Sequence, residues 1–237
     1  MKTKRGLISI ACVIAVALMS SAQVVHHEVK VGNFTRLNLL DDINVDYRCN
    51  ADSAGLAVFD CTRDVANSLL FSINDKGRLS IQVDDQYERQ GNLPTIILYS
   101  STLDEAENSG DSTMRVSGLP PLKAFKVRLT DNGKVIVRNV RASKLELQIL
   151  SGKGKIIADG SCDDLEIRLI GTGEIQADKV VATDVTCRIM GTGYIGCNVN
   201  GGQLKVSGSG TGKVYYKGEP EKVTVRKLGT IKAIPME

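Results

Sequence analysis

Apolar and polar residues alternate through the second half of the chain, and glycines interrupt the alternation at regular intervals. The copies of this strand–glycine–strand pattern read FKVRLTDNGKVIV, LELQILSGKGKIIA, LEIRLIGTGEIQA, VTCRIMGTGYIGC, LKVSGSGTGKVYY and VTVRKLGTIKA. The central glycines are Gly133, Gly154, Gly173, Gly193, Gly212 and Gly229, at steps of 21, 19, 20, 19 and 17 residues. A step of about 20 residues with strand patterning is one coil of a solenoid, so the chain is predicted to be all-β, a parallel β-solenoid.

Columns of residues at fixed distances from these glycines test the prediction. Two residues after each glycine lie Val135, Ile156, Ile175, Ile195, Val214 and Ile231. Four residues after lie Val137, Ala158, Ala177, Cys197, Tyr216 and Ala233, and four before lie Leu129, Leu150, Leu169, Ile189, Gly208 and Val225. Alternate residues of a strand share one face. We therefore expect the three columns to line a narrow apolar interior, one rung per coil.

Three Gly-Thr-Gly triplets, at 171–173, 191–193 and 210–212, invite comparison with phosphate-binding loops. A nucleotide fingerprint needs GxGxxG between a strand and a helix, whereas each triplet here leads directly into another strand. We expect the triplets at solenoid corners, where glycine supplies positive φ or lets two backbones approach closely.

The first half is also patterned for strands, but less regularly. The expected strands are Phe34–Leu40, Ile43–Tyr47, Leu56–Phe59, Leu69–Ile73, Leu79–Val83 and Thr95–Tyr99. Residues 74–77 read as a hairpin turn, and 84–93 as a polar loop. Further coils are expected to begin at Leu103–Asn108 and Leu119–Leu122, with degraded rungs. The N-terminal part is thus predicted to hold hairpin-like strands, either within one domain or as a second lobe that breaks near 84–115.

The first 22 residues have the composition of a secretory signal peptide. Lys2, Lys4 and Arg5 precede the apolar run Leu7–Met19, and Ser20-Ser21-Ala22 supplies small residues for cleavage. The run is too short for a transmembrane anchor. Lipidation of Cys12 is not favoured, because no apolar residue stands three positions before it. We expect residues 23–237 to form a single exported domain, in the periplasm, on the outer membrane surface or outside the cell.

The charge of the chain argues against nucleic-acid binding, and its uneven distribution raises the question of self-association. The chain has 30 basic and 27 acidic residues, and removal of 1–22 leaves a net charge of zero. This balance argues against a nucleic-acid partner. Charge is nevertheless uneven, with a net −9 over 39–111 and +7 over 115–160. Either two solvated faces differ in sign, or opposite ends associate head to tail.

Five cysteines remain after residue 22. Cys49 and Cys61 flank a turn signal at 52–55, so a disulfide could join them if two strands fold back there. Cys187 and Cys197 fall in apolar columns and are expected to be buried thiols. Cys162 falls at a corner. With no CxxC pair and only His26 and His27, no zinc site is expected.

Two sets of carboxylates are candidates for a chemical site. Five residues after successive glycines lie Arg138, Asp159, Asp178, Asn198 and Lys217. The three oxygen-bearing members could supply Ca²⁺ ligands, or they could bond local backbone N–H groups. We favour the second, because the two cations bracket the stack.

The other carboxylates, Asp163 and Asp164, are adjacent in one strand, so they face opposite sides and make a poor acid–base pair. His26 and His27 lie near an end that we expect to be mobile. The sequence therefore predicts no catalytic residues, no metal site and no cofactor.

Aromatic residues are scarce at 4%, and tryptophan is absent, which weakens the case for stacking on sugar rings. Tyr194, one residue after a corner glycine, is the best candidate for an exposed aromatic. Tyr87 and Tyr99 are weaker candidates.

Several segments together resemble the DUF2807 family, the putative auto-transporter adhesin head GIN domain of exported Bacteroidetes proteins. They are FTRLNLLDDINVDYRC, INDKGRLSIQV, the serial GTG strands, GTGKVYYKGEP and LGTIKAI. Tyr216, Gly218 and Pro220 match its Y-x-G-x-P segment, although this chain has GTG, GKG and DNG where the family usually has GSG. The resemblance covers about 30–235. It implies a right-handed β-solenoid (β-helix) in the cell envelope, without assigned catalytic residues.

Two functions follow as expectations. The first is a non-enzymatic exported cell-envelope or surface protein that presents a rigid β-solenoid for adhesion or assembly. The alternative is a carbohydrate-binding or carbohydrate-active β-helix protein, which would require a groove with converging carboxylates. The expected partner is a protein or glycan at the cell surface.

Overall fold

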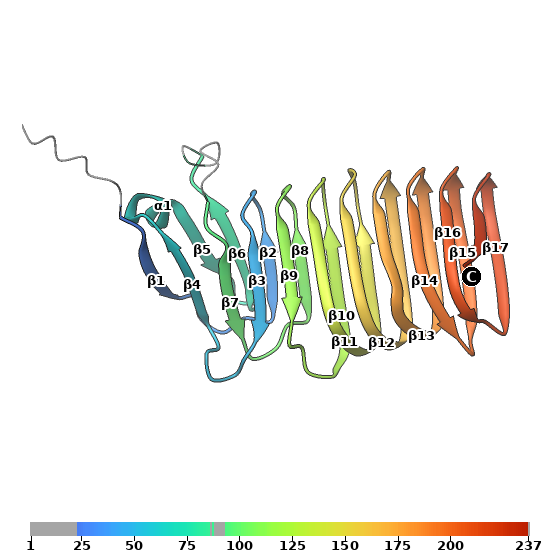
Figure 1. The fold of residues 1–237 in the computed structure, drawn as a ribbon, viewed down its shortest axis with the longest axis horizontal. Coiled ribbons are helices and arrows are strands. Elements are labelled where there is room, and N and C mark those ends of the chain that lie inside the picture. The colour runs from blue at the N-terminus through green and yellow to red at the C-terminus, as the bar shows by residue number, and fades with distance from the viewer. Residues whose placement is uncertain (1–22, 86, 88–92, 237) are drawn as a thin grey trace, which may run out of the picture.

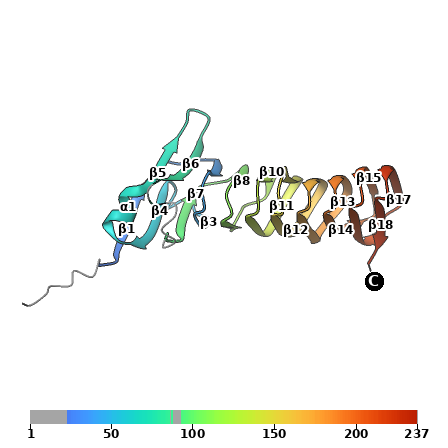
Figure 2. The same ribbon diagram turned by 90° about the horizontal axis from the view of Figure 1, so that it is seen from above.

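The computed structural model describes residues 23–85, 87 and 93–236. The chain stacks its strands along one long axis, and the views from the side and from above show a flattened solenoid (Figures 1 and 2). The predicted fold class, an all-β parallel solenoid with coils of about 20 residues, is confirmed. The expected signal peptide at 1–22 lies outside the described residues. Among those described, no helix is long and apolar enough to cross a membrane.

The described residues form eighteen strands and one short helix. They are β1 (Val25–Lys30), β2 (Arg36–Leu39), β3 (Val45–Cys49), β4 (Leu56–Cys61), α1 (Arg63–Ser68), β5 (Leu69–Ile73), β6 (Arg78–Val83), β7 (Ile96–Ser100), β8 (Glu105–Asn108), β9 (Thr113–Ser117), β10 (Leu122–Leu129), β11 (Lys134–Ile149), β12 (Lys155–Gly171), β13 (Glu174–Gly191), β14 (Tyr194–Asn200), β15 (Gln203–Gly210), β16 (Lys213–Glu219), β17 (Lys222–Gly229) and β18 (Lys232–Pro235).

Parallel pairing arranges the coils in two ladders. One, which we call the β17 face, runs through β6, β2, β8, β10, the second halves of β11, β12 and β13, then β15 and β17. The other, the β18 face, runs through β7, β3, β9, the first halves of β11 to β13, then β14, β16 and β18. The two faces enclose the core, and their outer sides carry side chains in register from coil to coil.

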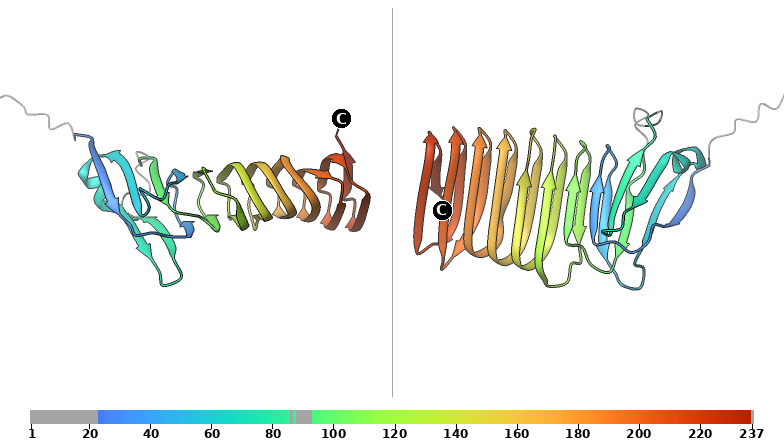
Figure 3. Two further views of the ribbon diagram at one scale, coloured as in Figure 1. Left: turned by 90° about the horizontal axis from the view of Figure 1, so that it is seen from below. Right: turned by 180° about the vertical axis from the view of Figure 1, so that it is seen from behind.

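The order of coils in space differs from their order in the chain. β2 pairs with both β6 and β8, and β3 pairs with both β7 and β9, so the first coil lies between two later ones. After β3 the chain leaves the stack through β4, α1 and β5, and returns on the outer side of the coil that it has just made (Figure 3). These rungs are in register and parallel, hence less degraded than the sequence suggested.

Antiparallel strands cover the N-terminal end of the stack. β4 pairs with β7, β1 pairs with β4, and β5 pairs with β6. The predicted hairpin turn is confirmed: the Asn74 N–H donates to the Arg78 carbonyl at 3.1 Å, and Gly77 has φ 68. The hairpin-like N-terminal part is therefore as expected, whereas β1, α1 and β9 were not predicted. Such a cap protects an open sheet edge from pairing with other chains.

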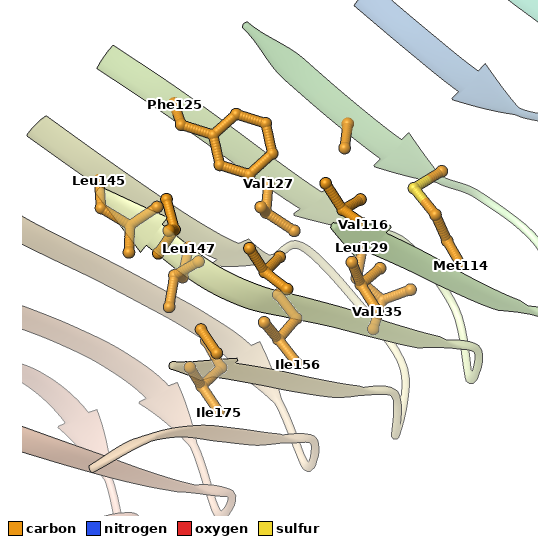
Figure 4. Close-up of a cluster of buried hydrophobic side chains, with 14 of the residues drawn as sticks. Met114, Val116, Phe125, Val127, Leu129, Val135, Leu145, Leu147, Ile156 and Ile175 are labelled. Atoms are coloured by element: carbon orange, nitrogen blue, oxygen red, sulfur yellow. The ribbon is translucent and has the colours of Figure 1, made fainter. Parts of the chain in front are cut away.

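A single apolar cluster fills the space between the two faces, and Figure 4 shows part of it. The column two residues after the glycines pairs in register and is fully buried, as predicted, at Val135, Ile156, Ile175, Ile195 and Val214. The column four before contains Ile149 and not Leu150. The corner from Ile149 to Ile156 holds one residue more than the corner from Leu129 to Val135, so counting back from Gly154 missed the register by one.

The last coil was also assigned the wrong register. Gly229 pairs with Gly210, so it is the first glycine of its corner. Ile231 therefore takes the position that the central glycine Gly212 has in the coil before. Consequently Ala233 pairs with Val214, and Val225 pairs with Val206.

The corner glycines act in both of the expected ways. Gly191 has φ 136, a region that side-chain-bearing residues rarely adopt. Gly193 has ordinary φ, but a Cβ there would lie 2.2 Å from the Gly173 carbonyl oxygen of the neighbouring coil. The triplets are thus corners that allow coils to stack.

The five cysteines among the described residues are free thiols. Cys187 and Cys197 are buried, as predicted, and so is Cys162, where burial and the nearby aspartates raise the thiol pKa to about 12. The disulfide that the sequence left open between Cys49 and Cys61 is not formed. β7 inserts between β3 and β4, pairing with each, and the Cys49 thiol instead donates to the Ser101 carbonyl at 3.1 Å.

Candidate binding site

Two tyrosines lie on neighbouring coils of the β18 face and form the candidate site. Tyr194 begins β14 directly after its corner, and Tyr215 lies on β16 in the next coil. Their ring centroids are 6.3 Å apart with an interplanar angle of 86°, and Tyr194 is 39% exposed. A hollow of about 300 Å³ lies against them, lined by Thr192, Gly193, Tyr194, Thr211, Lys213 and Tyr215. We call this set the tyrosine site.

Strand register fixes the tyrosine site from both sides. Tyr194 pairs with Glu174 on one neighbouring coil and with Lys213 on the other. Burial and a hydrogen bond with the Glu174 carboxylate raise the pKa of Tyr194. Glu174 in turn forms an ion pair with Lys155 at 2.9 Å. The ring is therefore held by a polar chain that crosses three coils.

A glycine occupies the outer-face position next to Tyr215. Gly196 stands in register between Gln176 and Tyr215, and it is itself buried. Its backbone does not require glycine, because its φ is not positive and an added Cβ would lie 3.6 Å from the nearest atom, Asp178 Cβ. Aromatic rings beside hydroxyl and ammonium groups can stack on the C–H face of a sugar and bond its hydroxyls.

The three tyrosines predicted to be exposed differ in their exposure. Tyr194 is exposed as expected, while Tyr99 and Tyr87 are only half-exposed, and Tyr87 packs against the core. Sequence reasoning missed Tyr215. The sequence did contain a signal for it. Tyr215 lies three residues after Gly212 and Tyr194 lies one residue after Gly193, so both positions point to the outer face of the strand.

The polar column expected at the corners does not form a stack of oxygens. A register shift places Asp159 opposite Lys179, not opposite Asp178. Each carboxylate has its own cation: Arg138 lies 2.8 Å from Asp159, and Lys217 lies 2.9 Å from Asp178. Burial would raise the pKa of Asp159, but hydrogen bonds from Arg138 and the Asn139 backbone lower it.

The remaining candidates for chemistry lie apart from one another. Asp163 and Asp164 are both exposed on β12. His26 lies in β1, paired with β4, and not in a mobile end as expected. Its Nδ1 is 2.7 Å from Asp60 Oδ1, and this hydrogen bond raises the pKa of His26 against a smaller opposing effect of burial. Among the described residues, no three His, Cys, Asp or Glu side chains gather as metal ligands.

These features define the class of the protein: a capped parallel β-solenoid whose corners are glycine triplets and whose outer faces carry side chains in register. The chain belongs to the family described as putative auto-transporter adhesin, head GIN domain (DUF2807), whose model matches residues 33–220. None of the curated proteins compared with the chain matches it.

Solved structures from three bacteria are similar in fold. One, described as a putative adhesin from Bacteroides fragilis, has 20% identity and a TM-score of 0.82, over 91% of this chain and 98% of that one. A putative adhesin from Parabacteroides merdae has 18% identity and a TM-score of 0.71, over 92% and 98%. A putative lipid binding protein from Parabacteroides distasonis has 20% identity and a TM-score of 0.69, over 92% and 98%.

Proposed function

We propose that the chain is a non-enzymatic, exported protein of the adhesin type, which displays binding side chains on a rigid β-solenoid at the cell surface. Membership of an adhesin-like family supports the exported location. The observation that carries the proposal is the in-register outer surface, where each coil places one residue beside its equivalent on the next. Such a surface holds a row of contacts in fixed spacing and loses little conformational entropy when a partner binds.

The positions of the candidate acid–base residues support a non-catalytic role. Glycoside hydrolysis needs two carboxyl groups facing one substrate across a short gap. Here Asp159 and Asp178 are each held by a different cation, and Asp163 and Asp164 are exposed neighbours on one strand.

Beads coated with residues 23–237 test the adhesin role. We expect them to adhere to at least one of a panel of surfaces that carry immobilised glycans or extracellular-matrix proteins, while beads coated with heat-denatured protein do not. Adhesion to none of the surfaces, or release of reducing sugar ends from a polysaccharide on incubation, would overturn the proposal.

A glycan-binding module is the second candidate, and the tyrosine site favours it. We expect a Tyr194→Ala/Tyr215→Ala variant to lose about tenfold in affinity for any neutral glycan that the wild type binds on an array, since each stacked ring contributes about 0.5–1.5 kcal/mol. The control is Tyr99→Ala, which alters a tyrosine at the other end of the solenoid. Equal losses from both variants would contradict a role for the tyrosine site.

A further inference from the structure

The C-terminal end of the β17 face carries cations in register on its outer side. Pairing aligns Arg168 with Arg188, Arg188 with Ser207, and Ser207 with Arg226, so that one column crosses four coils (β12, β13, β15 and β17 in Figure 1). The next column places Lys205 between two threonines. We call the cations of this region the basic strip; all are exposed, and they are Arg168, Arg188, Lys205, Lys222 and Arg226.

The positive charge of the basic strip is not neutralised by nearby carboxylates. Within the part of the chain that the structure describes, none of its five members forms an ion pair. The carboxylates closest in register are already engaged. Glu166 binds Lys144 at 3.1 Å, and Asp184 accepts a hydrogen bond from the Gln203 backbone at 2.8 Å.

The other end of the same face has the opposite arrangement. Glu105 lies 3.2 Å from Arg78 and also contacts Arg128, and Glu107 lies 2.9 Å from Arg78. On the β18 face, Asp46 likewise pairs with Arg115 at 3.2 Å. The acidic and basic stretches found in the sequence thus neutralise each other within one chain at several points. The charge available to a partner lies instead in a segment where the sequence count is nearly balanced.

A hollow of about 400 Å³ lies on the basic strip. It is lined by Thr186, Arg188, Gln203, Lys205, Val206, Ser207, Lys222, Thr224 and Arg226. Four of these residues are cations, three carry hydroxyls, and none is acidic or aromatic. Guanidinium groups bind carboxylate and sulfate through two parallel hydrogen bonds, and neighbouring hydroxyls can bond alcohol groups.

The lining also indicates which polyanion fits. Binding of single-stranded nucleic acid relies on aromatic side chains that stack on bases, and binding to a membrane surface relies on apolar side chains that insert. The hollow has no aromatic residue, and its one apolar residue, Val206, is buried. Charged and hydroxyl-bearing side chains that alternate along a straight column, about 4.8 Å apart, match a linear chain in which acidic groups alternate with hydroxyls.

We propose that the basic strip is a binding site for an anionic polysaccharide, one that carries sulfate or uronate groups, laid along the axis of the solenoid. The inference rests on the proposed adhesin role and names the ligand class for one face. The affinity would come from charge-assisted hydrogen bonds between the cations of the strip and the acidic groups of the polysaccharide. Binding should therefore weaken steeply as the salt concentration rises.

Dextran sulfate and unmodified dextran, which share one backbone, test the site with residues 23–237. We expect the wild type to bind dextran sulfate and not dextran by fluorescence anisotropy at low salt. An Arg188→Gln/Lys205→Gln/Arg226→Gln variant should lose at least about tenfold in affinity. The matched control, Lys134→Gln/Lys153→Gln/Lys232→Gln, removes the same charge away from the strip and should lose less than about twofold. Circular dichroism melts verify that both variants are folded.

Equal losses in the two variants would overturn the site, because binding would then follow net charge alone. Displacement of dextran sulfate by double-stranded DNA of equal charge, or by vesicles of anionic lipid, as readily as by unlabelled dextran sulfate would overturn the ligand class. The bead assay separates this inference from the proposed function. If the beads adhere but the strip variant binds dextran sulfate like the wild type, only the inference fails. If the strip variant loses binding but the wild-type beads adhere nowhere, only the adhesin role fails.

Discussion

An Ile175→Ala variant is expected to lose about 2–5 kcal/mol of the free energy of unfolding, the range seen when a buried aliphatic side chain is truncated. Ile175 is fully buried and stacks in register between Ile156 and Ile195. The strands on either side are hydrogen-bonded along their length, so they cannot move inward to fill the cavity. Chemical denaturation of residues 23–237, followed by circular dichroism, measures the loss.

The matched control is Ile157→Ala, which truncates a side chain on the outer face of the same strand. Ile157 follows Ile156 on the same strand, but it points outward and is half-exposed. Its truncation leaves no enclosed cavity and should cost about 1 kcal/mol or less. If both variants lost the same stability, the column of buried β-branched residues would not be what holds the coils together.

A Gly193→Ala variant is expected to be destabilised by about 1–3 kcal/mol or more, the range for forcing extra atoms into a packed interior. The added Cβ would lie 2.2 Å from the Gly173 carbonyl oxygen and 2.6 Å from Leu169 Cδ2. The first of these atoms belongs to the backbone of the preceding coil, so the two coils must separate at this corner. The midpoint of thermal unfolding should fall accordingly.

Gly196→Ala is the internal comparison, three residues further along the same coil. Its Cβ meets only ordinary contacts, and its φ lies outside the left-handed region. We expect its stability to equal or exceed that of the wild type, because alanine restricts the unfolded chain more than glycine does. A drop as large as that of Gly193→Ala would mean that close approach of the coils is not what requires glycine at position 193.

Much of the solenoid could be predicted because its core repeats a physical requirement at fixed spacing. The column through Val135 and Ile175 must be apolar and β-branched in every coil, so periodicity alone identifies it. Counting failed where a corner changed length. One extra residue before Ile156 shifts the column to Ile149, and a missing second glycine in the last corner leaves Ile231, not Gly229, at the position equivalent to Gly212.

Features that depend on distant parts of the chain could not be predicted in the same way. Nothing local in β4 signals that β7 will separate it from β3, so the sequence left open a Cys49–Cys61 disulfide that the fold does not form. The basic strip does not show in a count of charge along the sequence, because its three arginines share only a position five residues before Gly173, Gly193 and Ile231, and its two lysines lie in other columns. Tyr215 was missed because only single aromatics, and not pairs on adjacent coils, were considered.

The coil made by β2 and β3 has a consequence for how the molecule comes apart. Each coil after β10 contacts the coils next to it in the sequence, so it can be added or peeled away without disturbing the rest. The β2–β3 coil instead holds its neighbours on both sides through segments that follow much later in the chain. Under a pulling force applied at the C-terminus, the later coils would release one after another, whereas the N-terminal coils would yield together. The N-terminal end is thus the anchor of the solenoid, and the end that carries the tyrosine site and the basic strip is the one that unravels first.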